Sequence, residues 1–348
     1  MNLTNRMRKQ VILWMAGSLA GAFGLTLIIA FALRSPSPEA GKLDSISVPE
    51  SVVVARLIDQ STPAVPVFLS KEKRVDQIPI EAYVRGVIAA EMPIDFELEA
   101  LKAQALAART YIVRRMLDQD TSQVPVPGAI VTDTVSHQAY ITEAQLNLKW
   151  SGKDAAANME KLNRAVTETR GQIILYQGKP INAVFFSTSN GYTENSEDYW
   201  GEAVPYLRSV TSPWDAKLSP HAKETIKLPY KTFLSKLGLT GTVSASAAVS
   251  GTKTVKTTAG HRIGKISIGG KVFTGREVRE KLGLYSSQFQ WKLKGTDVEI
   301  TTYGYGHGVG MSQWGANGMA KQGKTAAEII QHYYTGVQIG NTNDTSKY

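Results

Sequence analysis

Apolar side chains recur at helical spacing along the segment from Ile80 to Glu91. Ile80, Val84 and Val87 are separated by four and three residues, so they lie on one face of a helix. Glu91, four residues after Val87, falls on the same apolar stripe. Because the residue before a proline is pushed out of helical backbone space, Pro93 predicts that this helix ends at about Glu91.

A second helix is predicted to follow at once. Asp95 can cap its first turn, and Arg114 and Arg115 in its last turn suit the negative end of the helix dipole. Further helices are predicted over 154–169 and 325–336, and the latter opens with a Thr-x-x-Glu capping-box pattern.

Segments rich in β-branched residues are interspersed with these helices. They cover residues 52–69, 173–188, 243–272 and 291–302. Because no regular βαβ rhythm appears, we expect a mixed helix/strand domain of the α+β class. Within it, residues 218–272 are rich in Thr, Ser, Lys and Gly, and they indicate an inserted β-rich lobe.

The run from Val11 to Leu33 contains no charged residue, and as a helix it would be roughly 34 Å long, enough to cross a bilayer. A cleaved signal peptide is the alternative, although its apolar core would be shorter. Arg6, Arg8 and Lys9 precede the run, so the positive-inside rule places the amino terminus in the cytoplasm. The predicted organisation is a cytoplasmic segment (1–10), a transmembrane anchor (11–33), a linker (34–50), an extracytoplasmic domain (51–340) and a polar tail (341–348).

Composition narrows the candidate chemistry. The chain has 348 residues, no cysteine and a net charge of +9. Disulfides, thiolate metal sites and thiol nucleophiles are therefore excluded. We expect the excess of basic residues to be spread along the chain. An anionic cell-wall polymer would suit this charge as well as a nucleic acid would, and we predict no nucleic-acid partner. The five histidines form no close pair with metal-ligand spacing, so neither a metal nor another cofactor is expected.

Glu91 is the leading candidate for chemistry in this pattern. A carboxylate on a core-facing stripe is costly unless it is paired with a cation or kept neutral. A partly dry glutamate has a raised pKa, as a general acid working near neutral pH requires. The alternative is a buried Glu–Arg ion pair with no catalytic role.

Glycine alternates with single side chains around His307. Residues 303–316 read YGYGHGVGMSQWGA. Such a run suits a backbone that must bend or approach another segment closely. It lacks the spacing of a dinucleotide-binding or P-loop fingerprint. Taken alone, it is also compatible with an ordinary turn between a strand and a helix.

This stretch resembles the G-x-G-H-G-V-G-M-S-Q-x-G-A signature of the stage II sporulation protein D family and its amidase-enhancer relatives. Further blocks similar to that family occur in its order, at residues 78–93, 101–111, 187–195, 279–284 and 332–336. The resemblance implies a membrane-anchored lytic transglycosylase that cuts peptidoglycan between MurNAc and GlcNAc during engulfment in endospore formation. It also implies a cell-wall amidase and a multispanning membrane protein as partners.

The resemblance gives Glu91 the catalytic role, because the family's catalytic glutamate precedes Met-Pro in the first block. Lys102 and Arg109 share one face of the second predicted helix, where they either snorkel beside an apolar stripe or line a groove next to Glu91. In a groove they would bind the free lactyl carboxylate of strands that an amidase has stripped of stem peptides. The predicted substrate-binding residues are Lys102, Arg109, Ser187, Ser189, Asn190, His307 and Gln313.

Two of these assignments have alternatives. Residues 187–190 form either a groove wall or a surface turn. Some family members carry cysteine and histidine before Gln-x-Tyr, thought to bind zinc. In this chain residues 132–140 keep only His137, which argues against a zinc requirement.

The number of carboxylates separates two reaction types. Hydrolysis of a glycoside needs two, whereas a lytic transglycosylase can use one, first as acid and then as base toward the C6 hydroxyl of the sugar itself. No other carboxylate shares the position of Glu91, which favours products with 1,6-anhydro-MurNAc ends. The alternative function is a non-catalytic glycan-binding protein that stimulates a cell-wall amidase, and a third is a structural linker across two facing membranes.

Overall fold

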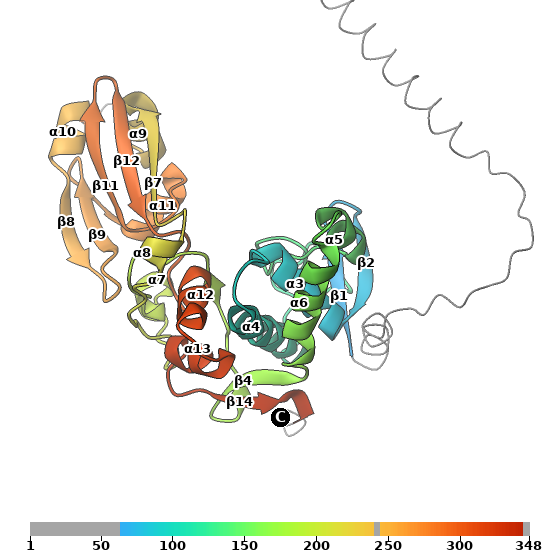
Figure 1. Ribbon diagram of the computed structural model, residues 1–348. Coiled ribbons are helices and arrows are strands. Elements are labelled where there is room, and N and C mark those ends of the chain that lie inside the picture. The colour runs from blue at the N-terminus through green and yellow to red at the C-terminus, as the bar shows by residue number, and fades with distance from the viewer. Residues whose placement is uncertain (1–62, 240–243, 344–348) are drawn as a thin grey trace, which may run out of the picture. The chain divides into compact units, whose positions relative to one another are not determined.

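The structure is a computed structural model that describes residues 63–239 and 244–343 (Figure 1). The predicted cytoplasmic segment, anchor and linker lie outside these residues, as does the polar tail from residue 344 onward. Within the described ranges, no helix has the length and apolar character needed to cross a membrane. The described residues combine helices with several separate sheets, which confirms the α+β class.

Helix α4 (Leu98–Leu117) is the central element of the larger hydrophobic core. It packs against α3 (Ile80–Glu91), α6 (Ala155–Thr167), α12 (Gln313–Lys321), α13 (Ala326–Tyr333) and β4 (Gln172–Tyr176). Many of its buried positions are alanine, at 100, 103, 105, 107 and 108. Such small side chains let neighbouring elements approach closely, and a helix with apolar residues around most of its circumference is typical of a core.

Two predicted helix ends are confirmed. α3 ends at Glu91, and Met92 after it has an extended backbone (φ −121°, ψ 141°) ahead of Pro93. Thr325 and Glu328 form the capping box that opens α13.

The start of α4 differs from the prediction. Glu97, not Asp95, is its N-cap residue, and it makes no side-chain cap hydrogen bond. The cause is a turn before the helix, in which the N–H of Phe96 donates to the carbonyl oxygen of Pro93 at 3.2 Å.

Short sheets and helices surround this core. In the first sheet, β1 (Ala64–Leu69) pairs antiparallel with β2 (Arg74–Pro79) and parallel with β3 (Val131–Thr132). In the second, β4 lies between β5 (Lys179–Pro180) and β14 (Gln338–Asn341). β6 (Phe185–Phe186) pairs in parallel with β13 (Met311–Ser312). The shorter helices are α5 (Glu143–Lys149), α7 (Ser196–Trp200) and α8 (Asp215–Leu218).

Residues 223–303, here called the lobe, have a hydrophobic core of their own. The elements are β7 (Lys223–Pro229), α9 (Tyr230–Leu237), α10 (Ala245–Ser250), β8 (Lys253–Thr257), β9 (Ile263–Ile268), β10 (Lys271–Thr274), α11 (Gly275–Leu282), β11 (Phe289–Lys294) and β12 (Asp297–Tyr303) (Figure 1). β12 lies between β11 and β7, with Asp297 opposite Pro229. This long-range pairing carries the lobe beyond the predicted boundary at residue 272.

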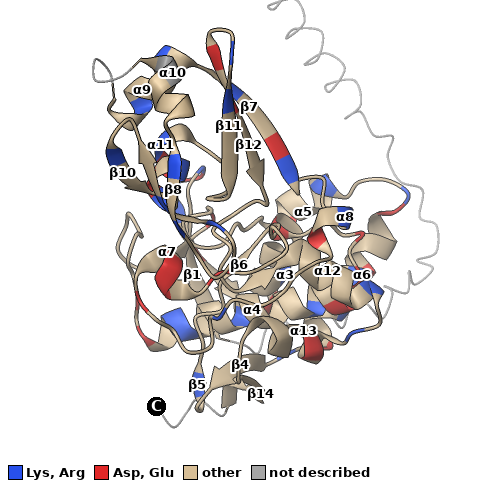
Figure 2. Ribbon diagram, turned by 90° about the vertical axis from the view of Figure 1, so that its left-hand side faces the viewer, with Lys and Arg blue, Asp and Glu red and all other residues tan. Residues whose placement is uncertain are grey.

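The basic excess of the chain is concentrated rather than spread. The lobe contains 14 Lys and Arg against 5 Asp and Glu, a difference of +9 that equals the net charge of the whole chain. Figure 2 shows Lys and Arg recurring across the strands and helices of the lobe. The lobe is therefore the part of the molecule suited to an anionic ligand.

A buried ion pair joins α3 to α4. The Nη2 atom of Arg109 lies 2.6 Å from Oε2 of Glu81, and both side chains are almost completely inaccessible to solvent. Arg109 Nη1 also donates to the carbonyl oxygen of Gln172 at 3.2 Å, and Glu81 Oε1 accepts the N–H of Gly171 at 3.2 Å. The pair therefore ties two helices to the start of β4.

Arg109→Ala is expected to lower the free energy of unfolding by about 3–5 kcal/mol, because it leaves the Glu81 carboxylate buried without its partner. Denaturant unfolding followed by circular dichroism measures the loss. The matched control is Arg114→Ala on the same helix, since the Arg114–Asp118 pair is exposed and should contribute less than about 1 kcal/mol. Equal losses in the two variants would contradict this account.

Candidate active site

A cavity of about 290 Å³ lies where the end of α3 meets the glycine-rich stretch and the lobe. Its walls come from α3, α4, α11 and α12 and from residues 135–138, 183–187 and 305–307. Four of the predicted site residues line it, namely Glu91, Ser187, His307 and Gln313. Segments far apart in the sequence therefore meet at one place.

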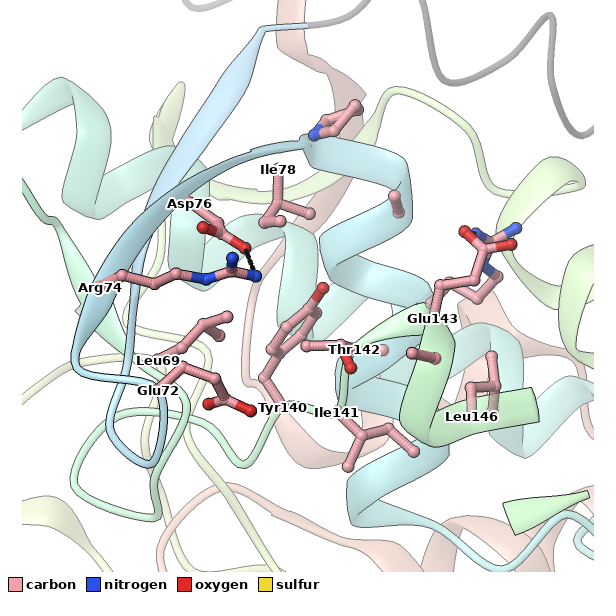
Figure 3. Close-up of a pocket in the computed structure, with 15 residues that line it drawn as sticks. Leu69, Glu72, Arg74, Asp76, Ile78, Tyr140, Ile141, Thr142, Glu143 and Leu146 are labelled. Carbon is pink, nitrogen blue, oxygen red and sulfur yellow. Dashed lines mark hydrogen bonds and ion pairs between the residues drawn. The ribbon is translucent and has the colours of Figure 1, made fainter. Parts of the chain in front are cut away.

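A second cavity, of about 420 Å³, lies between the β1–β2 hairpin and α5 (Figure 3). Figure 3 shows Arg74 pointing toward Asp76, and the two side chains form an ion pair at 2.9 Å. Arg85 and Glu143, also in its wall, form another at 3.1 Å. Because these charges pair with each other and no predicted site residue lines this cavity, the cavity at Glu91 is the better candidate.

Of the described residues that line the first cavity, only Glu91 carries a carboxyl group. The backbone N–H of Ala139 donates to its Oε1 at 2.8 Å, and the side-chain amide of Gln313 lies beside the same group. Burial raises the pKa of Glu91 above its ordinary value, and these two neighbours offset the rise only in part. A carboxyl group in this state can donate a proton closer to neutral pH than an exposed glutamate can.

The glycine-rich stretch follows a backbone path that side chains would obstruct. The four alternating glycines of this stretch, at positions 304, 306, 308 and 310, all have positive φ. An added Cβ at Gly308 (φ 89°) would lie 2.5 Å from Cζ of Arg262, and one at Gly310 (φ 78°) would lie 2.1 Å from the carbonyl oxygen of Val184. The predicted bend and close approach to other segments are both confirmed.

His307 is held by the backbone through both ring nitrogens. Nε2 donates to the carbonyl oxygen of Phe185 at 3.0 Å, and Nδ1 accepts the N–H of Val309 at 3.1 Å. Burial, together with the positive charges of Arg279 and Arg262, lowers the pKa of His307 to about 3. The ring is therefore neutral near pH 7, and its two hydrogen bonds fix the loop of residues 307–309 against Phe185.

Aromatic rings gather around His307. The ring centroids of Phe186, Tyr199 and Trp200 lie 5.7, 5.9 and 5.3 Å from that of the histidine. Trp200 is 40% exposed, so part of this aromatic surface faces solvent. Tyr199 and Trp200 each combine an apolar ring face with one polar group, as a sugar ligand would need.

Arg279 is a site residue to which the sequence analysis assigned no role. It belongs to α11 of the lobe, lines the cavity and donates from Nη1 to the hydroxyl of Tyr199 at 2.6 Å. The block at 279–284 was a signal, but no local pattern places it near Glu91. Only the packing of the lobe brings this cation to the cavity.

A buried polar cluster joins the lobe to the glycine-rich stretch. Arg262, 1% exposed, donates to Oγ of Ser286 at 2.9 Å and to the carbonyl oxygen of Gly306 at 3.3 Å. On the other side, Glu194 accepts the hydroxyl of Thr258 at 2.8 Å and donates its backbone N–H to the carbonyl oxygen of Gly308 at 2.8 Å. These contacts hold the loop of His307 in place.

Ser189 and Asn190 lie outside the cavity and have structural partners. The hydroxyl of Ser189 donates to the carbonyl oxygen of Ser212 at 3.0 Å, and its N–H donates to Asp215 at 2.7 Å. Nδ2 of Asn190 donates to the carbonyl oxygen of Gly260 at 2.9 Å. The two residues therefore support the segment that carries Ser187, and Asn190 joins that segment to the lobe.

The structure does not bring Lys102 or Arg109 to the cavity. Lys102 Nζ lies 2.7 Å from carboxylate oxygens of both Glu99 and Glu168, and Arg109 is committed to Glu81. The buried Glu–Arg pair considered for Glu91 thus exists elsewhere, at the other end of α3. Among the described residues, no group of three or more His, Asp or Glu side chains could hold a metal ion.

Comparison with known proteins adds independent information. The family SpoIID, described as a stage II sporulation protein, matches residues 69–176. The chain is 47% identical over 311 residues to stage II sporulation protein D of Bacillus amyloliquefaciens, which covers 89% of this chain and 88% of that protein. It is 47% identical over 289 residues to the protein of that name in Bacillus subtilis (strain 168), covering 83% and 82%. An amidase enhancer of Bacillus subtilis (strain 168) is 31% identical over 306 residues, covering 74% of this chain and 40% of that protein.

Glu194→Gln is expected to remove a pH dependence of stability. Burial raises the pKa of Glu194 from 4.5 to about 7, so the folded state binds the proton more tightly than the unfolded state. The protonated Glu194 therefore contributes to the free energy of unfolding, and this contribution is complete below the pKa of the unfolded state. It is lost as pH rises through the pKa of the folded state, which lowers the free energy of unfolding by about 3 kcal/mol.

Unfolding free energies measured from acidic to neutral pH test this. The wild type should lose stability relative to Glu194→Gln as pH rises, because the neutral amide mimics the protonated acid. Glu280→Gln, an exposed position of the lobe, is the matched control and should follow the wild type. Parallel curves for all three proteins would contradict the prediction.

Proposed function

This chain belongs to the SpoIID family of stage II sporulation proteins, and from that premise we propose that it is a lytic transglycosylase that cleaves peptidoglycan between MurNAc and GlcNAc. The observation that carries the proposal is the single carboxyl group of the cavity, that of Glu91, whose pKa is raised by burial. Hydrolysis would call for a second carboxylate, and the part of the chain that the structure describes brings no other to this cavity.

In the proposed reaction, the protonated Glu91 carboxyl group donates its proton to the oxygen that links C1 of MurNAc to C4 of GlcNAc. The bond from C1 to that oxygen breaks, and the GlcNAc end leaves as an alcohol. The resulting Glu91 carboxylate takes the proton of the MurNAc C6 hydroxyl, whose oxygen bonds to C1. The product is a 1,6-anhydro-MurNAc end; no water is consumed, and Glu91 regains its proton.

The cellular setting of this activity is part of the proposal. The uncharged run at 11–33 supports a membrane anchor with the carboxyl-terminal domain outside the cytoplasm. The sporulation relatives support a location at the septal membrane that engulfs the forespore. The amidase-enhancer relative supports a functional link to a cell-wall amidase, which would strip stem peptides before cleavage. A multispanning membrane protein of the engulfment machinery completes the proposed set of partners.

The same relative supports a second candidate function, a glycan-binding protein that stimulates an amidase without cleaving the strand itself. The two functions differ in what they require of Glu91. Cleavage needs a desolvated acid in the cavity, whereas binding alone gains nothing from its raised pKa.

Glu91→Gln in the full chain is expected to reduce cleavage of denuded glycan strands at least about 100-fold, because an amide cannot donate and then accept a proton. Its stability near neutral pH should be kept or increased, since a desolvated acid is replaced by a neutral group. Mass spectrometry of the products should show 1,6-anhydro ends for the wild type. The control is Glu160→Gln, an exposed glutamate of α6, which should cleave at the wild-type rate.

Each other outcome has a definite meaning. Reducing ends in the products would indicate attack by water and overturn the single-acid mechanism. Wild-type cleavage by Glu91→Gln would place the reaction elsewhere. If neither protein cleaves but both stimulate an amidase equally, the glycan-binding function is the correct one.

The rate of the wild type should fall as pH rises through the pKa of Glu91, because the catalytic form is the protonated acid. Since burial raises that pKa, the fall should lie above the titration range of an exposed glutamate. A profile of kcat/KM against pH measures it. A rate that instead increases steadily from acidic to neutral pH would show that Glu91 does not act first as an acid.

A further inference from the structure

We infer that Arg279 is the residue that recognises the free lactyl carboxylate of muramic acid, and that it thereby makes the cavity selective for strands without stem peptides. The inference rests on the proposed function in taking the glycan strand as the ligand. It assigns to the lobe a task that the sequence analysis had given to Lys102 and Arg109.

The guanidinium group of Arg279 is held in position, but not all of its hydrogen-bond donors have a partner. The Thr274–Glu277 capping box fixes the start of α11, and the Tyr199 hydroxyl holds Nη1 at 2.6 Å. In contrast, Nε is buried and makes no hydrogen bond to any part of the chain that the structure describes. A buried donor without a partner is costly, and a ligand acceptor would remove that cost.

Arg279 is also the only permanently charged cation that residues 63–239 and 244–343 place in the lining of the cavity. His307 is neutral there, and burial lowers the pKa of His137 as well. Glu91 does not neutralise Arg279 while it is protonated, as its catalytic role requires. The cavity therefore presents one fixed positive charge, on a lobe that carries the basic excess of the chain.

The ligand that fits this charge follows from the chemistry of the strand. The lactyl group is attached at C3 of the MurNAc ring whose C1 takes part in the cleaved bond, so its carboxyl group lies within one sugar ring of Glu91 in the proposed complex. When a stem peptide is attached, this group is a neutral amide. When the peptide has been removed, it is a carboxylate, which a guanidinium can bind through two parallel hydrogen bonds.

The test compares two substrates that differ only at this group. One is denuded glycan, and the other is the same glycan with its lactyl carboxylates converted to methylamides. The wild type should prefer the free carboxylate by about 10- to 100-fold in kcat/KM, and Arg279→Gln should abolish most of that preference. Arg279→Lys should keep part of it, because the charge remains but the planar fork is lost.

The matched control is Lys281→Gln, which removes one positive charge from the same helix at an exposed position outside the cavity. It should retain the wild-type preference. Thermal unfolding of each variant checks that the lobe stays folded. Equal loss of kcat/KM on both substrates in a folded Arg279→Gln protein would overturn the inference, as would a wild type that does not distinguish them.

Binding separates this inference from the proposed function. In the Glu91→Gln background, titration with the two glycans measures affinity without cleavage. A preference for the free carboxylate that disappears in Glu91→Gln/Arg279→Gln supports Arg279 as the recognition residue even if the wild type cleaves neither glycan. Equal affinity of Glu91→Gln for the two glycans overturns the inference even if the wild type produces 1,6-anhydro ends.

Discussion

The buried ion pair between Glu81 and Arg109 is the constraint on which the rest of the structure depends. It joins the first turn of α3 to the middle of α4, and the backbone around residues 171–172 supplies further partners. Because α3 is held at its first turn and packed along its apolar stripe, its last residue, Glu91, has a defined place at the other end. A charge pair far from the cavity thus sets the position of the candidate acid.

The cavity itself is assembled from parts that have no local relation to one another. α3 supplies the acid, α12 supplies Gln313, the glycine-rich stretch supplies His307, and the lobe supplies Arg279. The glycines serve this assembly because their positive φ values and missing side chains let the loop lie against residues 184–188 and over Arg262. Arg262 and Glu194 then connect the loop of His307 to the lobe that carries Arg279.

Three arginines illustrate how partners decide the role of a residue type. Arg109 is completely buried and paired with a carboxylate, so it is structural. Arg262 is equally buried but lies beneath a loop, to whose backbone it donates. Arg262 and Arg279 both keep buried donors without a partner among the described residues, but of the three arginines only Arg279 lines the cavity. It is therefore the one suited to a ligand there.

Local patterns in the sequence predicted those features that depend on local backbone geometry, namely the ends of helices and the path of a loop. Pro93 predicted the end of α3 at Glu91, and the Thr325–Glu328 capping box predicted the start of α13. The alternating glycines predicted a loop with an unusual backbone path. Which charges meet depended on the tertiary structure alone. It paired Arg109 and Lys102 with carboxylates away from the cavity and brought Arg279 to Glu91 through the packing of the lobe. The physical reason is that spacing along a helix reports which face a side chain occupies, whereas its partner is set by contacts between segments distant in the chain.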